Sequence, residues 1–162
     1  MNRYVILAIG SLDYLLSKTG NMLLRYSSQE VVAIIDPNHA GNTSDKVLGW
    51  GKKIPVVRSF NKSKKHDPNC LVIGSAPQGG ILSDLDRKEV INAIKEKCNI
   101  ISGMHIFLNE DGEISYLAKK NGVKIVDLRK PPNPPHFPNG SWLNRKFPVL
   151  AVVGSDCDTG KM

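Results

Sequence analysis

The residues with the clearest chemical potential form a glycine- and lysine-containing stretch near the C-terminal end of the sequence. The apolar run 149–153 precedes it and predicts a strand covered on both faces. Glycines at such a turn let backbone N–H groups approach an anion, and a lysine adds a mobile cation beside phosphate oxygens. The candidate phosphate- or nucleotide-binding residues are Gly154, Ser155, Asp156, Cys157, Asp158, Thr159, Gly160 and Lys161.

This stretch departs from the common phosphate-loop pattern G-x-x-x-x-G-K-[ST] at two positions. Ser155 replaces the first glycine, with Gly154 one residue earlier, and Met162 replaces the hydroxyl residue that would bind magnesium. The alternative interpretation is a strand that ends in an ordinary turn with one surface lysine. We favour a phosphate loop, because the strand context and the terminal Gly-Lys pair both agree with it.

Two other segments are candidate ligand loops, since each follows a predicted strand. Gly74, Gly79 and Gly80 lie in a glycine-rich turn whose backbone could meet a phosphate or a carboxylate. The same glycines would also serve a tight strand-to-helix connection. Asp36 and His39 follow the second predicted strand, where an acid either holds a ribose hydroxyl or caps a turn.

The segment after the first predicted strand does not support dinucleotide binding. The fingerprint requires three spaced glycines, but Gly10 is followed by Leu12 and Tyr14, which supply none. We therefore expect that NAD is not the cofactor.

The elements that must position these residues follow from the alternation of apolar runs with helical or polar segments. The predicted strands span residues 4–9, 31–35, 54–57, 70–74, 99–102 and 123–126. This alternation predicts an α/β fold with a doubly wound, mostly parallel, Rossmann-like sheet in which the first strand is central. Ligands of such sheets bind beyond the carboxyl ends of the strands, where all the loops named above would lie.

Helices are predicted where capping residues flank an apolar face. Ser83 is a suitable N-cap for a helix over residues 84–97, and Gly122 is suited to end a helix over residues 113–121. Residues 39–43 and the basic segment 58–69 are predicted to be polar loops.

Composition changes after residue 130. Residues 131–148 are rich in proline, which removes N–H donors and fixes φ, and this predicts an extended linker. We interpret residues 149–162 as the start of a truncated P-loop domain, because the helix that a phosphate loop requires does not follow Lys161. We therefore predict a Rossmann-like domain over residues 1–130 and expect this chain to be inactive alone.

Bulk composition restricts the functional classes. The chain has 22 Lys and Arg against 15 Asp and Glu, but the basic residues are dispersed without interleaved aromatics, which argues against nucleic-acid binding. The cysteines lie far apart without metal-binding spacing, so we predict reduced thiols, no metal site and a cytoplasmic protein. The apolar run at residues 4–9 is too short to cross a membrane and lacks signal-peptide features.

Six segments in combination make the sequence recognisable. They are GSLDYLLSKTGNMLLRYS near the N-terminus, DPNHAG after the second strand, VIGSAPQGG, ISGMHIFL, VDLRKPP and the terminal VGSDCDTGKM. With these segments the sequence resembles a bacterial and archaeal family long catalogued as a domain of unknown function, whose members have an N-terminal Rossmann-like domain and a C-terminal P-loop domain. The last segment also resembles the variant phosphate loop of dethiobiotin synthetase.

The resemblance implies that this chain is the N-terminal part of an enzyme similar to D-glutamate N-acetyltransferase, which takes acetyl from acetyl-CoA. The phosphate loop would hold the phosphates of CoA, or of ATP with magnesium, and the substrate would be a small acidic amino acid. A base must deprotonate the substrate amine, and His105 and Asp127, which follow the fifth and sixth predicted strands, are the candidate catalytic residues. We also expect a homo-oligomer.

The sequence leaves two alternatives open. Residues 1–148 could be a ligand-binding or oligomerisation module of an ATP-dependent P-loop enzyme, because a fold does not fix a function. Older names within the family suggest an NAD-dependent epimerase or dehydratase, and the missing glycine fingerprint gives that interpretation little support.

Overall fold

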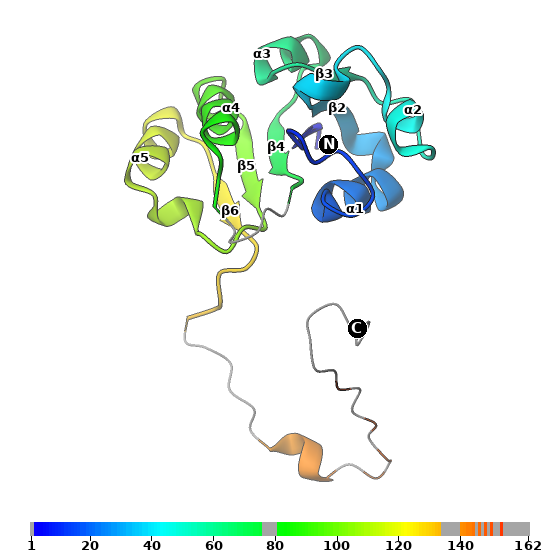
Figure 1. The fold of residues 1–162 in the computed structure, drawn as a ribbon. Coiled ribbons are helices and arrows are strands. Elements are labelled where there is room, and N and C mark those ends of the chain that lie inside the picture. Colours follow the sequence, from blue (N-terminus) through cyan, green and yellow to red (C-terminus); the bar gives the residue numbers. More distant parts are fainter. Residues whose placement is uncertain are drawn as a thin grey trace. The chain divides into compact units, whose positions relative to one another are not determined.

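The computed structural model describes residues 2–75, 81–133, 140–144 and the single residues 146, 148, 150 and 153. The chain divides into two units, Met1–Lys130 and Pro131–Met162 (Figure 1). The first unit contains the whole sheet and its helices. In the second unit, the described backbone includes one short 3₁₀ helix, Ser141–Asn144.

The first unit is built on a six-stranded parallel sheet with the strand order β3-β2-β1-β4-β5-β6. The strands are β1 (Tyr4–Leu7), β2 (Val31–Ile35), β3 (Val56–Val57), β4 (Cys70–Ile73), β5 (Asn99–Ser102) and β6 (Ile125–Asp127). The strand order reverses between β1 and β4, which pair from Tyr4 with Cys70 to Leu7 with Ile73. The prediction of a doubly wound, Rossmann-like sheet with a central first strand is therefore confirmed.

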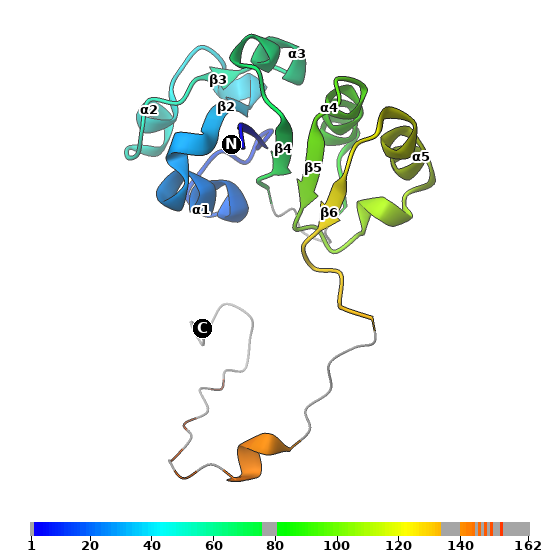
Figure 2. The same ribbon diagram turned by 180° about the vertical axis from the view of Figure 1, so that it is seen from behind.

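The sheet is covered by helices on both faces (Figures 1 and 2). The helices are α1 (Lys18–Tyr26), α2 (Ser44–Leu48), α3 (Phe60–Ser63), α4 (Asp84–Lys95) and α5 (Gly112–Asn121). Val5 and Leu7 of β1 pack into a core with α3, α4 and α5, whereas Ile6 and Ala8 pack with α1 and α2 on the opposite face. This alternation follows from the two-residue period of a strand, and it buries Val5, Ile6 and Leu7 of β1 completely.

The predicted helix boundaries are close to those observed. Ser83 Oγ accepts a hydrogen bond from the backbone N–H of Asp86 at 3.1 Å and so caps α4. Gly122 follows α5 with a φ of 67°, in the left-handed region that favours glycine. The helix predicted at residues 84–97 ends two residues earlier, at Lys95.

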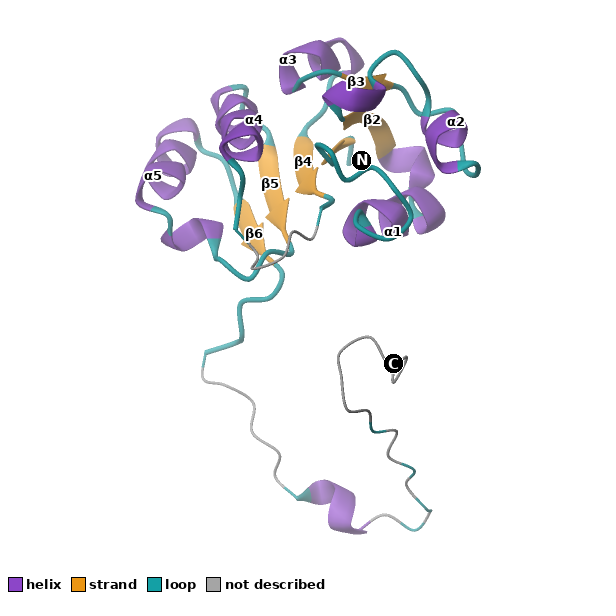
Figure 3. Cartoon of the chain, in the orientation of Figure 1, coloured by secondary structure: helices purple, strands orange, loops and turns teal. Residues whose placement is uncertain are grey.

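The structure differs from the prediction near two segments that were predicted as loops (Figure 3). Helix α2 directly follows the predicted loop 39–43, and α3 with the 3₁₀ helix Lys64–His66 occupies the predicted loop 58–69. The prediction for residues 58–69 is wrong because α3 is stabilised by tertiary contacts. Phe60 is 1% exposed, and its backbone N–H donates to Glu89 Oε2 of α4 at 2.6 Å.

Within the described part of the chain, no helix combines the length and the apolar character that a membrane span requires.

Candidate functional site

The structure brings the predicted site residues to the carboxyl edge of the sheet, in two separate groups. Asp36 and His39 follow β2 and lie beside the loop after β1. His105 lies in the loop after β5, and Asp127 is the last residue of β6. In the described residues, no hydrogen bond or ion pair joins the first group to the second.

Asp36 is fully buried, and its carboxylate is surrounded by donors from its own chain. Oδ1 accepts hydrogen bonds from the backbone N–H of Gly10 at 3.1 Å and of Asn38 at 3.2 Å, and Oδ2 lies 2.6 Å from His39 Nδ1. An acid at the end of the second strand holds a ribose hydroxyl in dinucleotide-binding sheets. Here the Asp36 carboxylate is bound by groups of its own chain, and the expectation that NAD is not the cofactor stays a prediction.

His39 lines a pocket of about 320 Å³ between the loops after β1 and β2, and its side chain is 42% exposed. This volume is at the lower end of the range for small-ligand pockets. The residues that line the pocket are Gly10, Leu12, Asp13, Tyr14, Asn38, His39, Val47 and Leu48. The last two belong to α2, which sequence reasoning missed, so this wall of the pocket could not be foreseen.

Gly74 lies at the switch point between β1 and β4, where it serves close packing. A Cβ atom on Gly74 would lie 2.6 Å from Ile6 Cγ2 and 3.2 Å from the carbonyl oxygen of Leu7. The carbonyl of Gly74 also accepts a hydrogen bond from Ser17 Oγ at 3.4 Å, just before α1. Packing accounts for this glycine, and its role as a ligand contact stays a prediction. Gly79 and Gly80 lie outside the described residues.

His105 is exposed beside Arg129, which follows β6. Arg129 Nη1 lies 3.1 Å from His105 Nε2 and 3.5 Å from Nδ1. A guanidinium can only donate, so the imidazole nitrogen that it contacts acts as an acceptor. The pair could bind an anion through Arg129, because this guanidinium has no carboxylate partner among the described residues.

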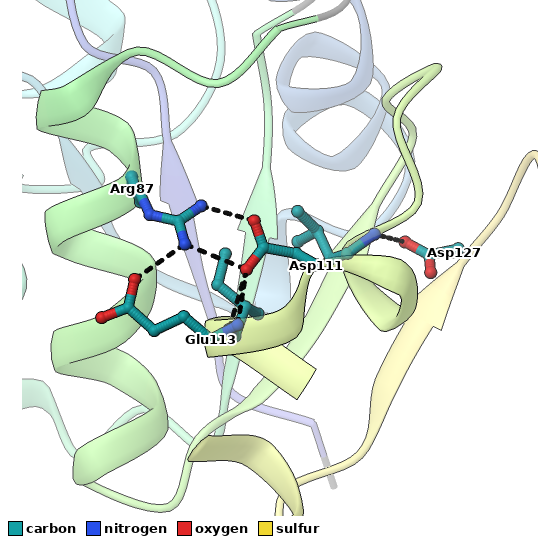
Figure 4. Close-up of polar contacts among 6 residues, drawn as sticks. Arg87, Asp111, Glu113 and Asp127 are labelled. Carbon is teal, nitrogen blue, oxygen red and sulfur yellow. Dashed lines mark hydrogen bonds and ion pairs between the residues drawn. The ribbon is translucent and has the colours of Figure 1, made fainter. Parts of the chain in front are cut away.

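Asp127 at the end of β6 holds the start of the 3₁₀ helix Leu108–Glu110 (Figure 4). Its Oδ1 accepts from the backbone N–H of Leu108 at 3.0 Å, and its Oδ2 accepts from the backbone N–H of Asn109 at 3.0 Å and from Asn109 Nδ2 at 2.9 Å. These three donors occupy both oxygens of the carboxylate and fix its orientation. The geometry therefore favours a positioning role, and catalysis by Asp127 stays a prediction.

A charged cluster that sequence reasoning missed joins α4 to α5 (Figure 4). Arg87 donates to both carboxylate oxygens of Asp111, which is the N-cap of α5, and to Glu113 at 2.8 Å. The hydrogen bonds from Arg87 lower the pKa of Asp111 to about 2. Because all three side chains satisfy one another, the cluster is structural.

The predicted phosphate-binding residues from Gly154 to Lys161 lie outside the described residues, so the phosphate loop stays a prediction. In the part that is described, no group of three or more His, Cys, Asp or Glu side chains is arranged to hold a metal ion.

The sequence of this sheet-forming unit matches a known family. Residues 37–131 match the family described as "Domain of unknown function (DUF1611_N) Rossmann-like domain". The chain belongs to this family. The resemblance inferred from the motifs is thereby confirmed.

Relatives and a solved structure support the same assignment. A D-glutamate N-acetyltransferase of Pseudoalteromonas sp is 33% identical over 104 residues, which cover 64% of this chain and 31% of the relative. A second D-glutamate N-acetyltransferase, from Tritonibacter scottomollicae, is 29% identical over 128 residues, which cover 78% of this chain and 37% of the relative. A DUF1611 family protein from Anabaena variabilis matches with a TM-score of 0.74 and 34% identity, over 81% of this chain and 37% of that one. This chain therefore spans about a third of the length of these proteins.

Proposed function

We propose that this chain is the Rossmann-like part of an acetyl-CoA-dependent N-acetyltransferase that acts on D-glutamate. The observation that carries the proposal is its similarity, at 33% and 29% identity, to two proteins with that name. The pocket at the carboxyl edge of the sheet supports it, because this edge is where doubly wound sheets bind ligands.

The predicted phosphate loop supplies the site for the acyl donor in this proposal. Backbone N–H groups of residues 154–160 and the ammonium of Lys161 would hold the phosphates of CoA. ATP with magnesium is the alternative ligand for the same loop, although Met162 replaces the hydroxyl that usually binds the metal ion.

The two substrates of this proposal, an acidic amino acid and acetyl-CoA, both carry anionic groups that require cations. Arg129 is suited to hold one such group of the larger substrate, acetyl-CoA, because it is exposed and has no carboxylate partner in the described parts of the chain. His105, which contacts it, would then lie beside the bound anion and help to orient it.

The test is acetyl transfer by the whole natural protein that contains these residues. Acetylation of D-glutamate with release of free CoA thiol is expected, with L-glutamate and D-aspartate as competing substrates. Calorimetry of acetyl-CoA and of ATP should show acetyl-CoA binding that Lys161→Ala abolishes. Lys146→Ala, which removes an exposed lysine, is the matched control and should bind normally.

Three outcomes would contradict parts of the proposal. Absence of acetyl transfer to any acidic amino acid would refute the activity. Binding of ATP alone would favour a ligase- or kinase-like reaction. Normal acetyl-CoA binding by Lys161→Ala would remove the phosphate loop from the acyl-donor site.

A further inference from the structure

We propose that Asp36 and His39 form a catalytic pair in which His39 takes the proton from the substrate amine, within the pocket between the loops after β1 and β2. The inference rests on the proposed N-acetyltransferase function and identifies the base that this reaction needs. It moves the base from the exposed His105, which the sequence suggested, to a histidine held by a buried carboxylate.

The hydrogen bonds around Asp36 fix the protonation of His39. Oδ1 of Asp36 accepts from the backbone N–H of Gly10 and of Asn38, so Oδ2 is left to face His39 Nδ1 at 2.6 Å. A buried carboxylate only accepts, and therefore Nδ1 carries the proton and Nε2 presents a lone pair. In the described residues, Nε2 has no hydrogen-bond partner. This arrangement is the one in which a carboxylate orients a histidine as a general base.

Local backbone structure makes the pair rigid. Asp36 ends the buried strand β2, and it caps the 3₁₀ helix Pro37–His39 through the backbone N–H of Asn38. Pro37 at the first position of this turn fixes φ, and the backbone N–H that proline lacks would have no partner within the turn. His39 follows three residues after Asp36 on a single short turn, so little freedom separates the carboxylate from the imidazole. A catalytic group held this way loses little entropy when substrate binds.

The pocket that His39 lines also contains a carboxylate suited to an ammonium group. Asp13 Oδ1 accepts the backbone N–H groups of Leu15 at 2.7 Å and Leu16 at 2.6 Å. Its Oδ2 has no partner among the described residues, and Asp13 lines the pocket together with His39. A carboxylate with a free oxygen attracts a cationic amine. The pocket therefore matches the amine end of an amino acid.

The hydrogen-bond partners distinguish His39 from His105. The Asp36 carboxylate lies 2.6 Å from His39 Nδ1 and orients the imidazole for proton transfer at Nε2. His105 instead has a guanidinium nitrogen of Arg129 at 3.1 Å from its Nε2, and in the described residues no carboxylate orients it. His39 is thus better placed to accept a proton, and His105 to help bind an anion.

The proposed acetyl transfer proceeds through the neutral amine of the substrate. The substrate ammonium first loses one proton to solvent, and its amine nitrogen then attacks the carbonyl carbon of the acetyl thioester. The N–C bond forms and the C–S bond breaks, while His39 Nε2 takes the proton that the nitrogen must lose. That proton returns to the departing thiolate, which yields free CoA thiol and the N-acetylated amino acid.

The kinetic test uses the whole natural protein and two variants. His39→Gln should lower kcat by about 10²- to 10⁴-fold with little change in the KM for D-glutamate. Asp36→Asn keeps an oxygen for the N–H groups of Gly10 and Asn38 but turns an amide N–H toward His39 Nδ1. The proton then moves to Nε2, so kcat should fall by a similar factor. His66→Gln is the matched control, because His66 precedes β4 at the opposite edge of the sheet.

A second measurement determines which nitrogen of His39 carries the proton, and it does not depend on enzymatic activity. Long-range ¹H–¹⁵N spectra of the 162-residue chain should show His39 protonated on Nδ1 at neutral to alkaline pH. The signals are assigned with His39→Gln, and Asp36→Asn should move the proton to Nε2. Retained folding of each variant is checked by circular dichroism.

The two measurements separate failure of the pair from failure of the function. An active wild type with full activity in His39→Gln overturns the pair and leaves the function standing. A wild type that acetylates nothing overturns the function and, with it, the assignment of His39 as the base in that reaction. Protonation of His39 on Nε2 in the wild type overturns the pair whatever the activity.

Discussion

Arg87 and Asp111 form a two-point ion pair that ties α4 to the start of α5 (Figure 4). Nη1 of Arg87 lies 2.6 Å from Oδ2 of Asp111, and Nη2 lies 2.9 Å from Oδ1. Oδ1 also accepts the backbone N–H groups of Glu113 and Ile114, so one carboxylate both caps α5 and pairs with α4. The pair is partly buried, with side-chain exposures of 31% and 24%.

Replacing Asp111 by alanine should therefore remove a cap and an ion pair together. We expect the free energy of unfolding to fall by about 2–3 kcal/mol, as measured by urea titration at pH 7. Glu110→Ala is the matched control, since Glu110 pairs with Lys130 while both side chains are exposed, and exposed pairs contribute about 0–1 kcal/mol. Equal losses in the two variants would show that the Arg87–Asp111 pair adds nothing beyond a surface contact.

The same pair predicts a pH dependence of stability. Arg87 lowers the pKa of Asp111 to about 2 in the folded chain, below the ordinary value of 3.8. Stability from this group is therefore fully present above about pH 4 and is lost as the pH falls from 4 towards 2. Asp111→Asn keeps the cap but cannot titrate, so the difference in unfolding free energy between wild type and this variant should shrink over that interval. A constant difference from pH 5 to pH 2.5 would contradict the assignment.

Gly74 and Gly103 offer a matched pair of glycines at the carboxyl edge of the sheet. An added Cβ on Gly74 would lie 2.6 Å from Ile6 Cγ2, whereas on Gly103 the nearest atom, Thr19 Oγ1, would be at 3.6 Å. Because Ile6 is fully buried, Gly74→Ala must shift the core and should cost about 1–3 kcal/mol in unfolding free energy. Gly103→Ala should lie within about 0.5 kcal/mol of wild type. Tolerance of alanine at both positions would show that the switch point is loosely packed.

The sheet could be predicted because its signals are local. Apolar runs such as residues 70–74 mark strands buried on both faces, and their alternation with helices implies the parallel winding. The start of α4 and the end of α5 could also be predicted, because Ser83 and Gly122 cap the helices that they adjoin in the sequence. Helix α3 was missed because the group that caps it, the Glu89 carboxylate, is 29 positions away in the sequence.

The candidate site could be predicted only in part, for the same reason. Asp36 and His39 were recognised as site residues from their position after a strand, which is a local signal. Whether Asp36 is open to a ligand depends on Gly10, whose N–H approaches from 26 residues earlier. Likewise, only the folded structure shows that the Asp127 carboxylate accepts the backbone N–H groups of Leu108 and Asn109, which lie 19 and 18 positions away in the sequence.

Asp127 can be tested for structural and catalytic roles separately. Asp127→Ala removes the acceptor for the N–H groups of Leu108 and Asn109, and should cost about 1–2 kcal/mol in unfolding free energy. Asp127→Asn retains one acceptor oxygen but cannot take up a proton as a base. In the whole natural protein, a positioning role predicts that the asparagine variant keeps most of its kcat. A loss of kcat by about 10²-fold or more in a folded asparagine variant would support the original assignment as a base.

Cys70 and Cys98 should be unreactive as long as the chain is folded. Burial raises the pKa of the Cys70 thiol to about 12 and that of Cys98 to about 11, and Cys98 Sγ also lies 3.1 Å from the carbonyl oxygen of Pro68. At pH 8 only about one thiol in a thousand or fewer would then be a thiolate, the form that reacts. In a Cys157→Ser background, labelling by a disulfide reagent should be at least about 100-fold slower than for a free cysteine and should become fast in urea. Rapid labelling without urea would mean that the amino edge of the sheet opens readily and that these thiols are not held in the core.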